Sequence, residues 1–237
     1  MSVIVRGPTL SEQVCEFVRE HIINGTYKPG QVLVEAELAE ELGVSRTPVS
    51  SALIVLKERG LLEEQGGRLA VAKQSIMDVV DLYRCRLALD SLATRLAAEL
   101  ITGEGLARLE HQLRVWERPP LEDDLHALWV ADMSFHEIIY QVTGNRHLIR
   151  FAQIAHELAA IYRRNTIRKL SASGQGRSRE VVRAEHQKIF ESLVERDPDL
   201  AEVAAREHVE NIIVHLNQLE VVNPNWDLED SGGDCSG

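Results

Sequence analysis

Apolar residues recur at helical spacing in the first part of the chain, and turns rich in glycine or proline separate the segments. Residues 10–24 have one apolar face, which predicts a first helix. Residues 35–60 then fit two short helices joined by a tight turn, because the first apolar stripe stops at Gly43. Glycine readily adopts the left-handed conformation that ends a helix, and Ser45 is placed to cap the helix that follows. The pattern therefore predicts a helix-turn-helix.

Two short apolar segments, residues 61–64 and 69–71, follow this helix pair and are predicted to be strands. Gly66-Gly67 lies between them, and two consecutive glycines favour the tight turn of a β-hairpin. A helix-turn-helix pattern alone is weak evidence, since any corner between two helices has a similar pattern. With a hairpin at this distance, residues 1–74 are predicted to form a winged helix-turn-helix domain.

From Ser75 onward the apolar pattern is helical, and no segment predicts a strand. The first helix of this region has two apolar stripes, which indicates cover on two sides, by its own domain and by a second subunit. Later helices, separated by breaks rich in glycine, asparagine or proline, are expected at residues 105–117, 121–143, 146–170, 178–195 and 199–220. Residues 75–222 are thus predicted to form an all-helical domain that binds a ligand and forms a dimer. The polar, acidic tail 223–237 is predicted to be disordered.

The second helix of the helix pair has a polar leading edge. Arg46, Thr47, Ser50 and Ser51 stay exposed when its apolar residues pack against the preceding helix. A short helix with such an edge fits the major groove of DNA. Arg68 lies at the wing, directly after the hairpin turn. These five residues are therefore the candidate DNA contacts.

The net charge of −11 is at first sight unfavourable for DNA binding. Its distribution is uneven, however, since residues 1–74 carry a net charge of −2 and the remainder −9. Cations cluster within or just after the helix pair, while the acids at residues 35–41 are expected to face away from DNA. We therefore expect DNA binding through one local patch rather than through the overall charge.

Ionisable side chains interrupt the apolar stripes of three predicted helices in the second domain. Asp132 and His136 are one turn apart on one helix, at positions where apolar residues are expected. His186 and His208 lie on the last two helices, each eleven residues from Asp197 at the break between them. If these two helices are antiparallel, the two imidazoles lie level. All four side chains then converge on one point inside the bundle.

One carboxylate and three imidazoles are suitable ligands for a divalent transition metal, with zinc favoured and nickel or manganese as alternatives. An octahedral arrangement would leave two positions for water or an incoming carboxylate. The alternative is that each is a core residue hydrogen-bonded to backbone or glutamate. For four residues meeting from three helices we favour the metal. His215 is interpreted as structural, and the remaining bundle histidines are interpreted as surface or capping groups: His111, His126, His147 and His156.

Composition favours a soluble, cytoplasmic protein without a membrane partner. No apolar run approaches the roughly twenty residues that span a bilayer, and the N-terminus lacks the features of a secretory signal. The three cysteines are odd in number and far apart, which indicates reduced thiols. No nucleophile motif and no general base accompany the four inward-facing residues. We therefore expect no enzymatic activity.

The words GTYKPG, LAEELGVSRTPV and LKERGLL occur in order within residues 10–72. This segment resembles the N-terminal domain of GntR-type bacterial transcription regulators. The resemblance implies a homodimer in which each second helix and wing bind one half of a palindromic operator. Arg46 and Thr47 match positions that contact DNA in this family. The chain departs from the family at Ser50-Ser51, where Arg-Glu is usual, so the family's common operator sequence is not assumed.

The words RLALDSLATRLAA, DMSFHEIIYQVTGNRHL and AAREHVENII resemble the ligand-binding FCD domain of the FadR branch of GntR regulators. The resemblance covers about residues 76–220. In that family an Asp-x-x-x-His pair and two later histidines bind metal, and they match Asp132, His136, His186 and His208. A family arginine maps onto Arg86, which implies a clamp for a carboxylate ligand. The alternative for Arg86 is a salt bridge with Asp90, one turn further along the same helix.

These patterns together favour a ligand-controlled transcription regulator, which in this branch is most often a repressor. A small organic acid would bind at the metal and Arg86, shift the helices and change the affinity for operator DNA. Two alternatives stay open. The first is a metal sensor, in which the ion itself is the signal, and the second is a metal-dependent enzyme fused to a DNA-binding module.

Overall fold

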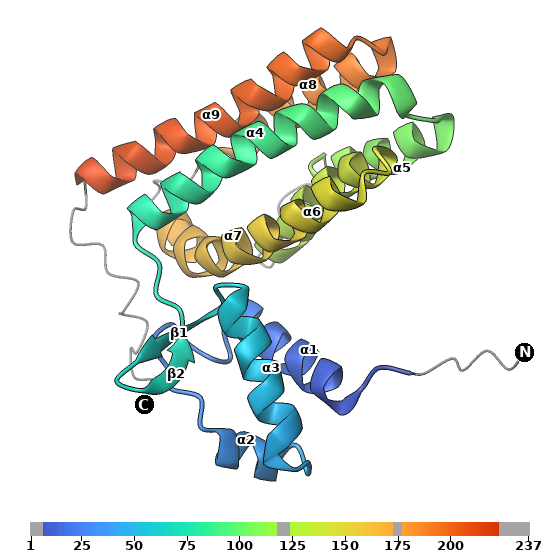
Figure 1. Ribbon diagram of the computed structural model, residues 1–237. Coiled ribbons are helices and arrows are strands. Elements are labelled where there is room, and N and C mark those ends of the chain that lie inside the picture. The colour runs from blue at the N-terminus through green and yellow to red at the C-terminus, as the bar shows by residue number, and fades with distance from the viewer. Residues whose placement is uncertain (1–6, 118–123, 173–176, 223–237) are drawn as a thin grey trace, which may run out of the picture. The chain divides into compact units, whose positions relative to one another are not determined.

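The computed structural model describes residues 7–117, 124–172 and 177–222 (Figure 1). The described residues divide into two compact units. The first holds residues 7–75 and 157–170, and the second holds residues 76–117, 124–156, 171–172 and 177–222. The tail 223–237, which was predicted to be disordered, lies outside the described residues. No helix in the described ranges is long and apolar enough to span a membrane.

The first unit is a winged helix-turn-helix, as the sequence pattern predicted. Its elements are α1 (Leu10–Ile23), α2 (Glu35–Glu41), α3 (Arg46–Glu58), β1 (Leu62–Gln65) and β2 (Arg68–Val71). The two strands pair antiparallel, with Gln65 opposite Arg68. Gly66 and Gly67, between them, have φ values of +58° and +77°. Positive φ at both central residues is what a two-residue hairpin turn of this hand requires, and glycine adopts it without steric cost.

The turn of the helix-turn-helix confirms one sequence-based expectation and changes another. Gly43 has a φ of +64°, the left-handed conformation expected after α2. Ser45 stands at the N-cap position of α3, but its side chain makes no capping hydrogen bond. An N-cap side chain accepts from the second or third backbone N–H of its helix, and Pro48 occupies the third position without an N–H. Ser45 therefore begins the helix without the stabilisation we expected from its hydroxyl.

The core of the first unit explains which face of α3 remains outside. Val49, Leu53 and Leu56 of α3 are fully buried and belong to one apolar cluster with Val18 of α1. Burying side chains of this size stabilises a fold by about 1.5–3 kcal/mol each. The buried positions of α3 recur every three or four residues, so the residues between them are exposed. The apolar stripe thus orients the polar edge of α3 outward.

The second unit is all-helical in its described part, as predicted. It is built from α4 (Ile76–Leu100), α5 (Gly103–Val115), α6 (Asp124–Val142), part of α7 (Arg146–Ala172), α8 (Arg179–Glu195) and α9 (Pro198–Val222). α4 packs along α9, α8 packs against α9, and α6 packs against both α4 and α5 (Figure 1). α5 begins two residues earlier than predicted, because the hydroxyl of Thr102 accepts a hydrogen bond from the Gly105 N–H and caps the helix.

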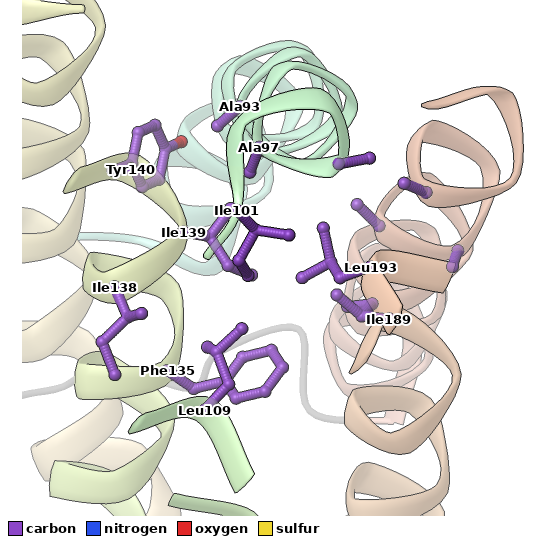
Figure 2. Packing of buried hydrophobic residues seen from close by; sticks show 14 of the residues in the cluster. Ala93, Ala97, Ile101, Leu109, Phe135, Ile138, Ile139, Tyr140, Ile189 and Leu193 are labelled. Atoms are coloured by element: carbon purple, nitrogen blue, oxygen red, sulfur yellow. The ribbon is translucent and has the colours of Figure 1, made fainter. Parts of the chain in front are cut away.

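Large and small apolar side chains interdigitate at the centre of the second unit (Figure 2). Phe135 and Ile139 of α6 lie in one cluster with Leu193 of α8, while α4 contributes Ala93 and Ala97. All five are almost fully buried. The alanines allow the backbone of α4 to come close to its neighbours, and well-packed cores have little freedom to shift. The packing therefore fixes the positions of the helices that carry the candidate metal ligands.

The break between α8 and α9 is as short as the sequence indicated. Arg196 has a left-handed backbone, with a φ of 55°, and its guanidinium donates a hydrogen bond to the Ile101 carbonyl at 2.5 Å. The Asp197 carboxylate then accepts hydrogen bonds from the backbone N–H groups of Asp199 and Leu200, both at 3.0 Å, at the start of α9. This short link lets α9 pack back against α8.

Candidate DNA-binding surface and metal centre

The five candidate DNA contacts all lie at the surface of the first unit. Arg46, Thr47 and Ser51 of α3 are exposed, Ser50 is half-buried, and Arg68 is exposed at the start of β2. The Arg46 side chain is 70% exposed, so most of the guanidinium is available to a phosphate or a base. The structure thus leaves these side chains accessible, and their contacts with DNA remain a prediction.

Two neighbours of this edge were not expected from the sequence. Ile54, one turn after Ser50, is 52% exposed although it is a large apolar residue. Glu35, at the start of α2, lies 3.7 Å from Arg46, measured between Oε2 and Nη2. We had expected the acids at residues 35–41 to face away from DNA, and Glu35 instead lies beside the main cation of the edge. If Arg46 binds a DNA phosphate, as predicted, a carboxylate at this position would compete for it.

Replacing Glu35 by glutamine is therefore expected to raise operator affinity. Exposed ion pairs typically contribute about 0.2–1 kcal/mol, so two copies in the proposed dimer predict a roughly two- to thirtyfold tighter complex. Fluorescence anisotropy with a labelled operator fragment measures the change. Glu58→Gln, at the opposite exposed end of α3, is the control with the same charge change and is expected to have a smaller effect. Equal or weaker binding by Glu35→Gln would contradict competition for Arg46.

The four inward-facing residues of the second unit meet at one point, as predicted. Asp132 and His136 come from α6, His186 from α8 and His208 from α9. All four are buried, and each offers a ligand atom within 4.8 Å of the other three. The rings of His186 and His208 are 4.7 Å apart between centroids, as expected for equal distances from the turn at Asp197. Side chains from three helices therefore form one cluster.

The spacing and chemistry of the cluster fit a divalent metal ion. Nε2 of His186 lies 3.4 Å from Nε2 of His136 and 3.3 Å from Oδ1 of Asp132. Two ligands bound to zinc at about 2.0–2.1 Å in tetrahedral geometry are about 3.3–3.4 Å apart. Nε2 of His208 is buried and has no hydrogen-bond partner among the described residues. A buried nitrogen without a partner is costly, and a bound cation would remove that cost.

The surroundings of His136 favour its neutral imidazole. Burial lowers the pKa of His136 far below its usual range, and the nearby Arg86 guanidinium lowers this pKa further, against the opposing effect of Asp132. A neutral imidazole is the form that donates a lone pair to a metal. The ring centroid of His186 lies 4.8 Å from that of Phe135 and 5.5 Å from that of Trp116. These aromatic side chains help to keep water away from the centre.

Glu185 is a neighbour of the cluster that sequence reasoning missed. Its Oε2 lies 2.8 Å from Nδ1 of His208, and its Oε1 accepts hydrogen bonds from Arg177 and Asn211. Burial opposes ionisation of this carboxyl, but the hydrogen bonds from His208 and Arg177 outweigh it and lower the pKa to about 2. No sequence pattern pairs Glu185 with His208, because the contact joins two helices. Metal-bound histidines usually donate their second nitrogen to a carboxylate, and Glu185 has the position of such a partner.

Arg86 forms the salt bridge that the sequence analysis offered as the alternative to a ligand clamp. Its Nη2 donates to Oδ2 of Asp90 at 3.0 Å, and both side chains are buried. The Tyr140 hydroxyl donates to the other oxygen of Asp90 at 2.5 Å. Burial raises the pKa of Tyr140, and the negative charge of Asp90 raises it further, so the phenol keeps its proton. This network holds Arg86 in place, and its role toward a ligand remains a prediction.

The interpretation of His156 as a surface or capping group was wrong. Its side chain is buried, its ring centroid lies 6.1 Å from that of His136, and its Nε2 lies 4.0 Å from Oδ1 of Asp90. Burial lowers the pKa of His156 to about 3, with a further contribution from Arg86, so the imidazole is neutral. The sequence did contain a signal for this burial. Leu148 and Ala152 precede His156 at four-residue spacing, so His156 continues an apolar stripe, and both residues are buried.

The other histidines divide more simply. His111 and His147 are exposed, and His215 is half-buried on α9, where burial lowers its pKa. The side chain of His126 lies outside the described residues.

A winged helix-turn-helix followed by an all-helical unit is an arrangement found in DNA-binding regulators. The sequence matches the profile of the gntR family of bacterial regulatory proteins over residues 10–70 and that of the FCD domain over residues 81–211. The chain therefore belongs to the GntR family of bacterial transcription regulators and carries an FCD domain, as the FadR branch does.

Relatives along the whole chain support this assignment. An uncharacterised HTH-type transcriptional regulator of Bacillus subtilis, YdhC, is 30% identical over 203 residues, which cover 84% of each chain. The HTH-type transcriptional repressor RspR of Escherichia coli is 29% identical over 226 residues, covering 93% of this chain and 95% of RspR. The solved structure of E. coli McbR/YncC shares the fold, with a TM-score of 0.71 at 23% identity, over 90% of this chain and 99% of that one.

Proposed function

We propose that this DNA-binding regulator is a repressor controlled by a small organic acid that binds beside a divalent metal in the FCD domain. The observation that carries the proposal is the convergence of Asp132, His136, His186 and His208 inside the bundle. The name of the relative RspR supports repression as the direction of control. Zinc is the favoured ion, because imidazoles and one carboxylate are among its common ligands.

The effector site is proposed to lie between the metal and Arg86. With a coordination number above four, the bound ion would supply a Lewis-acidic position for a carboxylate oxygen in addition to its four protein ligands. Arg86 contributes a second positive charge, held in place by Asp90 and by the phenol of Tyr140 behind it. A carboxylate favours bidentate contact with arginine, which would select organic acids over neutral compounds of the same size.

The proposed homodimer agrees with the apolar residues at the surface of the second unit. Leu92 and Leu100 of α4 are 46% and 53% exposed, although the sequence pattern placed them on an apolar stripe. Val203 and Val214 of α9, the helix packed along α4, are 49% and 55% exposed. A second subunit that covers such residues removes them from water and places two α3 helices on one palindromic operator.

Operator binding measured in three states of the protein tests the proposal. We expect metal-loaded protein to bind the operator, and metal-loaded protein with the right organic acid to bind it five- to 150-fold more weakly, the usual range of allosteric coupling. The operator fragment must weaken acid binding by the same factor, because linkage is reciprocal. An effect of metal alone, with no acid effective, would identify a metal sensor. Turnover of an acid that is lost in His186→Ala would identify an enzyme.

Removal of the metal is expected to destabilise the second unit. An ion that binds only the folded state at one hundred times its Kd stabilises it by about 2.7 kcal/mol. For a domain of this size that corresponds to a Tm difference of roughly 5–10 °C. Thermal unfolding of zinc-loaded and chelator-treated protein, followed by circular dichroism, measures the difference. Identical Tm values with and without zinc would contradict binding to the buried cluster.

A further inference from the structure

The buried carboxylate of Glu185 has both of its oxygens engaged by protein groups. Oε2 lies 2.8 Å from Nδ1 of His208, while Oε1 accepts from Asn211 at 2.8 Å and from the Arg177 guanidinium. A carboxylate restrained by three partners has little freedom to rotate or to leave. Glu185 therefore presents one fixed acceptor oxygen to one nitrogen of one imidazole.

This contact determines which nitrogen of His208 can bind a metal. A carboxylate oxygen accepts hydrogen bonds, so Nδ1 of His208 is the donor in this contact, and the ring can bind a metal only through its other nitrogen. The lone pair is then on Nε2, which is buried and has no hydrogen-bond partner among the described residues. The rings of His136 and His186, at 5.3 and 4.7 Å between centroids, surround His208 on the side of the cluster. Nε2 is thus the nitrogen that His208 can offer to the cluster, to which each residue contributes one ligand atom.

We propose that Glu185 is a positioning residue of the metal centre, which sets the tautomer and the orientation of His208, with Arg177 and Asn211 holding it in place. The inference rests on the proposed metal site. A purely structural ion pair between Glu185 and His208 would need no metal, and its loss would reduce stability without changing how a metal is bound. The two readings therefore differ in a measurable way.

The variant Glu185→Gln distinguishes a positioning role from a purely structural ion pair, because glutamine has nearly the same volume as glutamate but no charge. Its amide can also donate to Nδ1, which would place the proton on Nε2, the ligand atom. We expect Zn²⁺ affinity to fall by 10- to 100-fold, the usual effect of removing an outer partner of a metal-bound histidine. Competition with a chromophoric chelator measures the Zn²⁺ affinity. The measurement is made at pH 8, because protons then compete only weakly with the metal. The absorption bands of Co²⁺-loaded protein should also change, which a loss of stability alone would not cause.

Glu195→Gln is the matched control, since Glu195 is an exposed glutamate on the same helix, α8. It should bind Zn²⁺ as the wild-type protein does. Wild-type affinity and an unchanged Co²⁺ spectrum in Glu185→Gln would overturn the inference. An equal loss in both variants would also overturn it, because the effect would then come from net charge.

A second measurement needs only the wild-type protein and therefore does not depend on the folding of a variant. Long-range ¹H–¹⁵N spectra of the zinc-loaded protein should show His208 protonated on Nδ1 and bound through Nε2. Binding through Nδ1 would overturn the inference while leaving the metal site intact. A wild-type protein that binds no zinc would overturn the metal site itself, and with it the role of Glu185.

Discussion

Replacing His208 by alanine is expected to lower the affinity of the protein for zinc by at least about a hundredfold. Loss of an outer partner of a metal-bound histidine costs 10- to 100-fold, and loss of a ligand atom should cost at least as much as the upper end of that range. Nε2 of His208 is buried, and His208 is almost fully buried beside the other three residues of the cluster, so bulk water does not reach this position without rearrangement. The operator response to an organic acid should weaken in parallel.

Metal analysis of the purified variant, together with chelator competition, measures this loss. His111→Ala is the control, because His111 is exposed on α5 and is not part of the cluster. It should retain the zinc content of the wild-type protein. Full occupancy and unchanged affinity in His208→Ala would remove His208 from the site and would leave only three candidate ligands.

Replacing Arg46 by alanine is expected to weaken operator binding by about a hundredfold. A good arginine contact to DNA is worth about 1–3 kcal/mol. A dimer on a palindromic operator loses one such contact in each half-site. The chain has few other cations on this edge, because Ser50 and Ser51 stand where the family usually has arginine and glutamate. If Arg46 binds a phosphate, the slope of log affinity against log salt should also become smaller, by about one for each phosphate that is no longer neutralised.

The affinity is measured by fluorescence anisotropy on a fragment obtained by in vitro selection with the wild-type protein. Lys28→Ala removes the same charge from an exposed position of the same unit and should have a much smaller effect. The far-UV circular dichroism of Arg46→Ala should match that of the wild-type protein, since the side chain is exposed. Unchanged affinity would mean that α3 is not the reading helix.

The parts of the site that the sequence predicted are those that depend on periodicity alone. Asp132 and His136 are one helical turn apart, and His186 and His208 are equally far from a break at Asp197, so helical geometry brings them together once the helices are antiparallel. The separation of 4.7 Å between the last two rings confirms that reasoning. The hairpin was predictable for a similar reason, because two glycines at one turn leave few alternatives.

The parts that the sequence did not predict depend on contacts between helices. Glu185 is adjacent in sequence to His186, but its carboxylate bonds to His208 on another helix, which no periodicity within α8 indicates. His156 follows Leu148 and Ala152 at four-residue spacing, which indicates that it faces inward, but only the packing between helices shows that it lies beside His136. Ser45 makes no capping hydrogen bond, and Pro48 lacks an N–H at one of the two positions that an N-cap side chain can use, a detail that residue preferences at the N-cap do not include.

Anomalous scattering from crystals of zinc-loaded protein, collected on both sides of the zinc edge, tests the central claim most directly. One peak per chain is predicted, about 2.0–2.2 Å from an oxygen of Asp132 and from Nε2 of His136, His186 and His208. The absence of a peak among these four side chains in fully loaded crystals, or a peak bound to other residues, would contradict the metal centre and the sensing function built on it.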